Sequence, residues 1–325
     1  MDSKTKNKKT RQQIEKMAER AFNGATLSSD DDAVIELTDG FFNAVYKIKL
    51  KNGRQVILKI APPKDADVQR YEKNIMRTEV NCMCLVHEHP DIPVPEIYFY
   101  DDTHELCDAD YYFMEKISGE NFYQVKDSLS LEVLSDIQFR IGEIIHAING
   151  FRGLFFGYEG NTDLQSDNWK ETFIKIIDAL LDDGRQKDVD FGFGYIEIQE
   201  IVLKNAAVLE EIIIPQLIHW DGWDGNFFVQ DGIISGLIDF ERALWGDPLM
   251  EMQFRPLLLE GNTNSIRGYG KTDFTPTETM RCQLYSLYLA LAMYTESFYR
   301  NYDNDYIFNI AAQMLQGSMR WLKEN

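Results

Sequence analysis

The residues best suited to chemistry lie between positions 217 and 241, in the stretch LIHWDGWDGNFFVQDGIISGLIDFE. Two apolar runs flank an Asp-Gly pair, and this pair favours the tight turn of a β-hairpin because both residues tolerate positive φ angles. Closing the hairpin brings Asp221, Asn226 and Asp239 near one another. Their oxygen atoms suit a hard cation such as Mg²⁺, which proteins bind together with substrate phosphates. The stretch therefore predicts a site for Mg²⁺ and a phosphate-bearing substrate.

A lysine near the end of an apolar strand supports the same chemistry. Three short strands are predicted between residues 33 and 61, and the third, QVILKIA, carries Lys59. An ammonium group in an apolar strand is costly unless it meets anions; the alternative is an edge lysine that faces solvent. Downstream, Glu79 interrupts the apolar face of a helix predicted at 66–87, with Glu72 as a competing carboxylate. We expect Glu79 to point toward the sheet, and a surface position is the alternative.

Three motifs resemble the aminoglycoside phosphotransferase family of small-molecule kinases. The segment HWDGWDGN, which contains Asp221, is similar to the H-x-D-x-x-x-x-N catalytic loop of kinases. The segment IDFE, which contains Asp239, is similar to their metal-binding segment, and GDP follows it. Trp220 departs from the family, which usually has a small residue at that position. The resemblance covers roughly residues 35 to 255, and the lysine strand and helix glutamate upstream agree with it.

The resemblance implies an α+β, bilobal protein-kinase-like fold. A small β-rich lobe, residues 1–116, would bind the nucleotide and include a basic N-terminal arm and a short helix. Residues 117–325 would form the larger, mainly helical lobe, with the catalytic residues and the acceptor site. Hydrophobic periodicity predicts helices at 12–24, 66–87, 131–148, 167–183, 195–212, 277–300 and 304–323, and composition predicts a loop at 261–276.

The resemblance also assigns the parts of phosphoryl transfer to named residues. Lys59, oriented by Glu79, would hold the α- and β-phosphates of the nucleotide. Asn226 and Asp239 would hold Mg²⁺. Asp221 would be the catalytic residue, because it would accept or orient the proton of the acceptor hydroxyl.

Further nucleotide contacts are expected in the small lobe and at its border. Gly40 lies in a turn whose backbone N–H groups can approach phosphates without a Cβ in the way, and a plain tight turn is the alternative. Where the strand near residue 115 runs into a linker, backbone groups of Glu115 and Ile117 are expected to bind the nucleotide base. The remaining expected contacts are Phe41, Asn43, Ile57, Met114 and Ile238.

Three other polar residues of the motifs have supporting roles in this interpretation. His219 is expected to shape the catalytic loop without titrating in the reaction. Asp224 either meets a cationic acceptor or caps the turn. Asp247, in the GDP motif, is expected to brace the catalytic loop through hydrogen bonds.

Composition excludes several classes of function. The 325 residues carry a net charge of −20, which disfavours a nucleic-acid partner because such a partner requires a basic face. No apolar run reaches the ~18 residues that would span a bilayer, and the polar N-terminus lacks the apolar core of a signal peptide. The four cysteines show no metal-ligand spacing, so we expect reduced thiols in a cytoplasmic protein. A monomer is favoured.

The leading hypothesis is a kinase that moves the γ-phosphoryl group of ATP or GTP to a hydroxyl of a small molecule, with Mg²⁺ as cofactor. The acidic balance favours a cationic acceptor such as an aminoglycoside or an amino alcohol. A non-catalytic nucleotide-binding protein of the same fold is the alternative. A metal-dependent hydrolase built on the histidine and carboxylates of the hairpin would leave Lys59 without a purpose. A protein kinase is disfavoured because no D-F-G or A-P-E motif follows.

Overall fold

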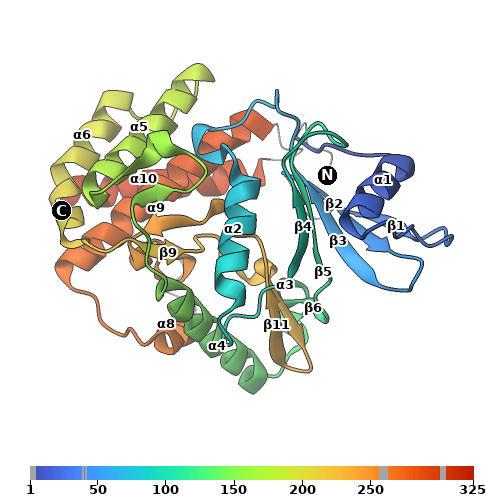
Figure 1. Ribbon diagram of the computed structural model, residues 1–325. Coiled ribbons are helices and arrows are strands. Elements are labelled where there is room, and N and C mark those ends of the chain that lie inside the picture. The colour runs from blue at the N-terminus through green and yellow to red at the C-terminus, as the bar shows by residue number, and fades with distance from the viewer. Residues whose placement is uncertain (1–4, 39, 41, 256–262, 301–304) are drawn as a thin grey trace.

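The computed structural model describes residues 5–38, 40, 42–255, 263–300 and 305–325. In Figure 1 a sheet and helix α1 (Arg11–Ala21) lie on the right, most of the helices lie on the left, and helix α2 (Ile75–His87) stands in front between them. This is the α+β arrangement of a small β-rich lobe and a larger helical lobe that the sequence predicts.

The small lobe is built on a five-stranded antiparallel sheet in the order β1-β2-β3-β5-β4. Its strands are β1 (Val34–Leu37), β2 (Ala44–Lys49), β3 (Gln55–Ile60), β4 (Ile97–Asp101) and β5 (Tyr111–Glu115). Alternate residues of the central strand β3 face two different helices. Val56, Leu58 and Ile60 pack with residues of α1, whereas Ile57 packs with residues of α2. Because side chains alternate along a strand, Lys59 shares the face of Ile57 and is directed toward α2.

Helix α2 is shorter than the sequence predicts. It begins at Ile75, and its N-cap residue Asn74 has a left-handed backbone with φ 56°. That conformation separates α2 from an isolated 3₁₀ turn at Arg70–Glu72. The side chain of Asn74 donates a hydrogen bond of 2.9 Å to the Gly160 carbonyl in the large lobe. The predicted helix is therefore wrong over residues 66–74, because a tertiary contact holds the chain out of helical geometry there.

The large lobe contains most of the helices and two small sheets. Its helices are α3 (Phe122–Val125), α4 (Leu131–Asn149), α5 (Trp169–Gln186), α6 (Tyr195–Asn205), α8 (Thr263–Tyr269), α9 (Pro276–Arg300) and α10 (Tyr306–Glu324). The sheet β11-β10-β6 contains β6 (Glu120–Asn121), β10 (Phe227–Gln230) and β11 (Ile233–Leu237). The sheet β8-β7-β12-β9 contains β7 (Phe156–Tyr158), β8 (Gln165–Ser166), β9 (Gln216–Ile218) and β12 (Leu244–Gly246).

The predicted hairpin is present as β10 and β11. Asp231 and Gly232 form its turn with φ angles of 52° and 78°, as the Asp-Gly pair indicates. The stretch before it does not extend the hairpin, because β9 pairs with β12 in the other small sheet. The polar residues 219–226 therefore form a loop that passes from one sheet to the other.

The predicted loop at 261–276 is wrong over residues 263–269, which form helix α8. Helices α8 and α4 approach so closely that only glycines fit between them. A Cβ atom on Gly142 would lie 1.9 Å from the Ser265 carbonyl oxygen, and one on Gly268 would lie 1.9 Å from that of Phe139. This contact between distant segments is not visible in local composition.

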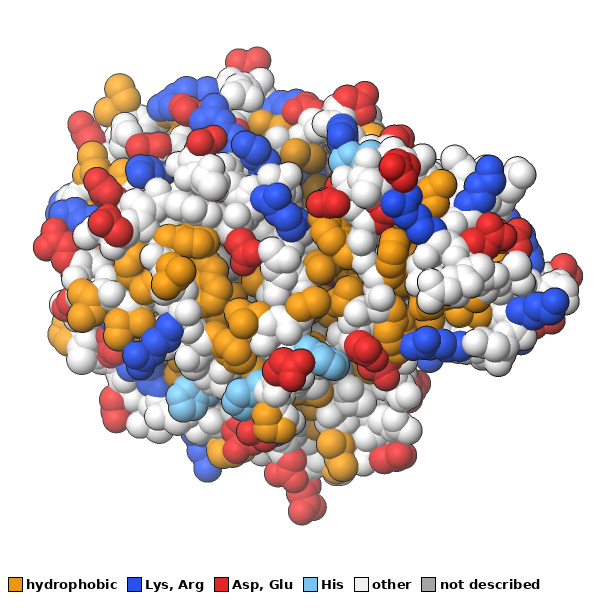
Figure 2. Space-filling model, in the orientation of Figure 1, with side chains coloured by type: hydrophobic (Ala, Val, Ile, Leu, Met, Phe, Trp, Pro, Cys, Tyr) orange, Lys and Arg blue, Asp and Glu red, His pale blue; other side chains and the backbone are white. Residues whose placement is uncertain are grey.

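The surface carries both signs of charge. Figure 2 shows acidic and basic side chains interspersed around the edge of this face, with hydrophobic side chains gathered toward its middle. Within the described ranges, no helix combines the length and the apolar character needed to cross a membrane.

Substituting Gly142→Ala should destabilise the protein by about 1–3 kcal/mol, because the added methyl group overpacks the contact between α4 and α8. The matched control is Gly317→Ala in α10, where a Cβ would meet nothing within 4 Å. That change should stabilise the helix by about 0.5–1 kcal/mol, because position 317 is exposed within α10. Urea unfolding of both variants measures the difference, and equal effects would contradict the close approach.

Candidate active site

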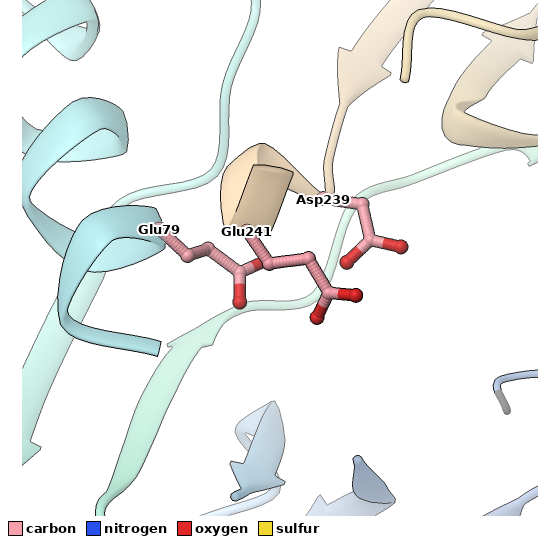
Figure 3. A group of neighbouring side chains, drawn as sticks. All are labelled: Glu79, Asp239 and Glu241. Carbon is pink, nitrogen blue, oxygen red and sulfur yellow. The ribbon is translucent and has the colours of Figure 1, made fainter. Parts of the chain in front are cut away.

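The centre of the site is one ammonium group among three carboxylates. Lys59 Nζ lies 2.8 Å from both oxygens of Glu79, 2.5 Å from Asp239 Oδ1 and 3.4 Å from Glu241 Oε2. Figure 3 shows Glu79 on α2 and the two other acids converging on one point, and carboxylate oxygens of the three lie within 4.8 Å of one another. The site thus joins the sheet, α2 and the segment after β11. The expectation that Glu79 points toward the sheet is confirmed, and Glu72 instead pairs with Arg300.

Burial and mutual repulsion shape the charges of this cluster. Burial lowers the pKa of Lys59, but the carboxylates of Asp239 and Glu79 outweigh that effect and hold the pKa well above its usual value. Burial raises the pKa of Glu79 to about 8 and also raises that of Glu241. Burial acts in the same direction on Asp239, yet Lys59 holds the pKa of this carboxyl below its usual value. Lys59 and Asp239 therefore stay charged at neutral pH.

The loop before β10 presents Asp221 without a partner. Trp220, which precedes it, is buried with a left-handed backbone of φ 67°. Asn226 donates from Nδ2 to the Asp221 carbonyl at 2.8 Å. In the part of the chain that the structure describes, the Asp221 carboxylate makes no hydrogen bond or ion pair, and its residue is half-buried. A carboxylate held in this way can accept a hydrogen bond from a substrate hydroxyl.

The donor set for a divalent cation fits Mg²⁺. The Nδ2 atom of Asn226 is occupied by its bond to the loop, so its amide oxygen is the atom that remains for a ligand. Asp239 keeps one oxygen away from Lys59, and its side chain is 30% exposed. Ile238 N donates a hydrogen bond of 3.0 Å to the Asn226 carbonyl, which joins the two segments that carry the candidate metal ligands. Amide and carboxylate oxygens are the ligands that Mg²⁺ prefers.

The other sequence-predicted nucleotide residues lie around this centre. Asn43 is buried and donates from Nδ2 to Glu241 Oε2 at 2.7 Å. Ile57 and Met114 are buried on the α2 side of the sheet. Gly40 has open space where a Cβ would be. Phe41 lies outside the described residues.

The linker predicted to meet the nucleotide base begins at the end of β5. The N–H of Glu115 donates to the Glu96 carbonyl at 2.8 Å, so this N–H is already used within the small lobe. The side chain of Ile117 covers Gly236 of β11, where a Cβ would lie 2.5 Å from it. The carbonyl of Ile238 is 3.0 Å from His219 Nε2, so this group serves the loop.

Glu251 holds the backbone of the catalytic loop through hydrogen bonds, and the sequence analysis did not identify it. Its Oε1 accepts from His219 N at 2.8 Å and from Asn149 Nδ2 at 2.9 Å, and its Oε2 accepts from Trp220 N at 3.0 Å. Its one sequence signal is a lone carboxylate in the apolar run PLMEMQF. Asp247, which was expected in this role, instead accepts hydrogen bonds from Arg281, Tyr285 and Leu249 N. A carboxylate does hold the loop through hydrogen bonds, but it is Glu251 and not the predicted Asp247.

Two further residues that the sequence reasoning missed hold carbonyls of the same loop. Gln253 donates to the Gly222 carbonyl at 2.9 Å, and Arg255 donates to the Trp220 carbonyl at 2.6 Å. The guanidinium of Arg255 also lies over the Trp220 ring, 5.0 Å from its centroid. The segment after the GDP motif thus fixes the loop backbone from several directions.

A small β-rich lobe, a helical lobe and a lysine-carboxylate centre between them define a kinase-like phosphotransferase. Residues 33–252 match the model of the phosphotransferase enzyme family, named APH. The chain belongs to this family, which confirms the resemblance seen in its motifs.

Solved structures of aminoglycoside phosphotransferases share the fold over nearly the whole chain. A thermostable mutant of APH(4)-Ia in ternary complex with ADP and hygromycin B is 17% identical, with a TM-score of 0.64 over 94% of this chain and 98% of that one. The ternary complex of APH(2'')-IIa with streptomycin and ATP is 14% identical, with a TM-score of 0.62 over 98% and 97% of the two chains. At such identities the likeness shows the kinase-like fold.

Two curated relatives match part of the chain. They are subtelomeric hrmA-associated cluster proteins from two strains of Aspergillus fumigatus, each 33% identical over 149 residues. The match covers 46% of this chain and spans 28% of the length of those relatives.

The contacts of His219 predict how stability changes with pH. Its Nε2 faces the Ile238 carbonyl and therefore carries the proton, while its buried Nδ1 has no partner among the described residues. Burial lowers the pKa of this histidine, so the unfolded state takes up a proton more readily than the folded state. Stability should therefore fall as the pH drops below about 6.5, the ordinary histidine value.

The test compares urea unfolding of the wild type with His219→Gln between pH 7 and pH 5. Glutamine can keep a donor near the Ile238 carbonyl and does not titrate. The wild type should lose stability relative to this variant as the pH falls. A difference that stays constant across the range would show that His219 titrates normally.

Proposed function

We propose that this protein is a small-molecule kinase, which moves the γ-phosphoryl group of ATP or GTP to a hydroxyl of its acceptor. The observation that carries the proposal is the arrangement of Lys59 against Glu79 and Asp239, next to a loop whose Asp221 carboxylate makes no hydrogen bond or ion pair with the described residues. Residues 1–116 would form the nucleotide-binding lobe, and residues 117–325 the catalytic and acceptor-binding lobe.

In this proposal the nucleotide phosphates bind at Lys59. Glu79 holds the ammonium group in place, and backbone groups near Gly40 cover the phosphates. Asn226 and Asp239 hold Mg²⁺, which neutralises the charge on the phosphate oxygens when it is bound. The carbonyl of Glu115 and the backbone of Ile117 take the nucleotide base, with Ile57, Met114 and Ile238 beside it.

Asp221 acts on the acceptor in this proposal. Its carboxylate receives the hydrogen bond of the acceptor hydroxyl and aims the oxygen at the γ-phosphorus atom. It takes the hydroxyl proton as the new P–O bond forms and the bond from the γ-phosphorus to the β-phosphate oxygen breaks, which releases ADP or GDP. Glu251 keeps the loop in position by holding the backbone of His219 and Trp220. Phosphoryl transfer depends mostly on such positioning and on electrostatic stabilisation, because the protein contributes little covalent chemistry.

The geometry counts against a hydrolase that uses the hairpin carboxylates as ligands of a catalytic metal. The space between Glu79, Asp239 and Glu241 is taken by the ammonium group of Lys59. A non-catalytic nucleotide-binding protein would not need an unpartnered carboxylate at Asp221. The proposed kinase uses both the ammonium group of Lys59 and the carboxylate of Asp221.

Substituting Asp221→Ala should reduce kcat for phosphoryl transfer about 10²–10⁴-fold and leave nucleotide binding nearly unchanged. Lys59→Ala should instead weaken nucleotide binding as well as turnover. Transfer is measured with Mg²⁺ and ATP or GTP against aminoglycosides, amino alcohols and sugars, and binding is measured by calorimetry with ADP.

The control is Lys49→Ala, which removes the same charge from the neighbouring strand β2. Lys49 pairs with Asp30 at the surface, where its side chain is 36% exposed. This variant should behave like the wild type. Full phosphoryl transfer by Asp221→Ala would contradict the role of Asp221, and nucleotide binding that is indifferent to Lys59→Ala would contradict the site.

A further inference from the structure

Two exposed aromatic side chains stand beside the catalytic loop. Trp223 is 38% exposed and Tyr123, from α3, is 53% exposed. Their ring centroids are 5.3 Å apart, with the planes tilted by 56°. Trp223 is the most exposed of the five tryptophans, while Trp220 in the same loop is buried between the guanidinium groups of Arg242 and Arg255. Of the two tryptophans in the loop, Trp220 is therefore packed in the core, and Trp223 is partly exposed to solvent.

The exposed pair is held in place. The indole of Trp223 covers Gly225 so closely that a Cβ there would lie 2.2 Å from the ring. The Gly225 carbonyl in turn accepts a hydrogen bond of 2.6 Å from Asn121 Nδ2. The ammonium group of Lys126 lies 4.6 Å from the centroid of the Tyr123 ring. Large aromatic surface that is fixed and partly exposed is suited to binding, because little conformational entropy is lost when a ligand covers it.

The pair is tied to Asp221 through the backbone. Asp221 N donates to the His219 carbonyl at 2.9 Å, and Trp223 N donates to the Asp221 carbonyl at 2.9 Å. These two hydrogen bonds hold residues 219–223 in one compact stretch, in which the first turn has a left-handed centre at Trp220 and the second does not. The Trp223 indole and the Asp221 carboxylate therefore belong to residues that the loop backbone holds two positions apart.

Charge at the edge of the pair is already neutralised. Lys126 Nζ forms an ion pair of 2.8 Å with Asp224, and both side chains are about a third exposed. Asp224 therefore lacks the free carboxylate that an ammonium group of a cationic acceptor would require. The charge at this edge is therefore balanced locally, whereas the net charge of −20 acts as a long-range field.

We propose that Trp223 and Tyr123 form a ring-binding subsite of the acceptor pocket, so that the acceptor is a hydroxyl-bearing ring compound, either a sugar-like ring or an aromatic ring. This inference rests on the proposed kinase function, because that function identifies the bound molecule as the acceptor. A ring lies with its face against the indole, and one of its hydroxyl groups reaches Asp221. Stacking of this kind accepts C–H groups of a saturated ring as well as a planar aromatic face.

The experiment uses the whole chain and two kinds of readout. Acceptor KM and nucleotide KM are measured with hygromycin B, methyl glucoside and 4-hydroxybenzyl alcohol as ring compounds, and with choline and ethanolamine as acyclic ones. Binding of the same compounds in the presence of Mg²⁺ and ADP is followed by tryptophan fluorescence. Trp223→Leu removes the aromatic face, and Trp223→Phe keeps one.

Trp223→Leu should raise the KM for ring acceptors about tenfold, with nucleotide KM unchanged, and Trp223→Phe should restore most of the affinity. The control Phe298→Leu alters an exposed aromatic side chain on α9, where Phe298 is 37% exposed and its ring centroid lies 6.0 Å from that of the buried Tyr294. It should leave every acceptor KM unchanged. Preference for methyl glucoside identifies a sugar-like acceptor, and preference for the benzyl alcohol identifies an aromatic one.

Several outcomes separate this inference from the kinase proposal. If the wild type transfers phosphate to choline or ethanolamine and Trp223→Leu has no effect, the subsite is wrong and the kinase stands. If ring compounds bind and change the Trp223 fluorescence but receive no phosphate, the subsite stands and the kinase fails. Equal increases in acceptor and nucleotide KM in Trp223→Leu would assign the indole a structural role and overturn the subsite.

Discussion

The interaction on which the rest of the structure depends is the contact of one lysine with three acids, of which Glu79 and Glu241 are buried and Asp239 is partly exposed. Lys59 comes from the sheet, Glu79 from α2, and Asp239 and Glu241 from the segment after β11. Each carboxylate alone would pay a large cost for burial, and together they repel one another. The ammonium group compensates for both effects, so the small lobe, α2 and the large lobe meet at a single point. Removing it would leave three acids within 4.8 Å of one another.

The catalytic loop is held by a different arrangement, in which buried polar groups bind its backbone and leave one acid free. Glu251 accepts hydrogen bonds from two consecutive N–H groups, while Gln253 and Arg255 donate to carbonyls of the same loop. Because these contacts use the backbone, the Asp221 side chain does not have to hold the loop together. In the proposed kinase, a loop held in this way would keep the Asp221 carboxylate in position for the acceptor hydroxyl.

Local patterns in the sequence predicted the central parts of the site and missed its supports. The Asp-Gly turn, the β3 lysine and the acid in the apolar face of α2 each follow from short-range rules. The structure pairs Lys59 with Glu79 as expected, and it also brings Asp239 to Lys59, which the sequence did not predict. Glu251 was missed because its partners are backbone N–H groups about 30 residues earlier in the chain, which leave no side-chain signature. Helix α8 was missed for a related reason, since its contact with α4 joins distant segments.

The charge balance of the centre gives the most direct test of this account. Lys59 already pairs with the charged carboxylate of Asp239, so it offers little net positive charge to bare phosphates, and the nucleotide should bind together with a divalent cation. The measurement is calorimetric binding of the non-hydrolysable analogue AMP-PNP to the wild type and to Lys59→Met, with and without Mg²⁺. The account predicts binding that requires both Mg²⁺ and Lys59. Tight binding without Mg²⁺, or binding unaffected by Lys59→Met, would show that the nucleotide does not use this centre.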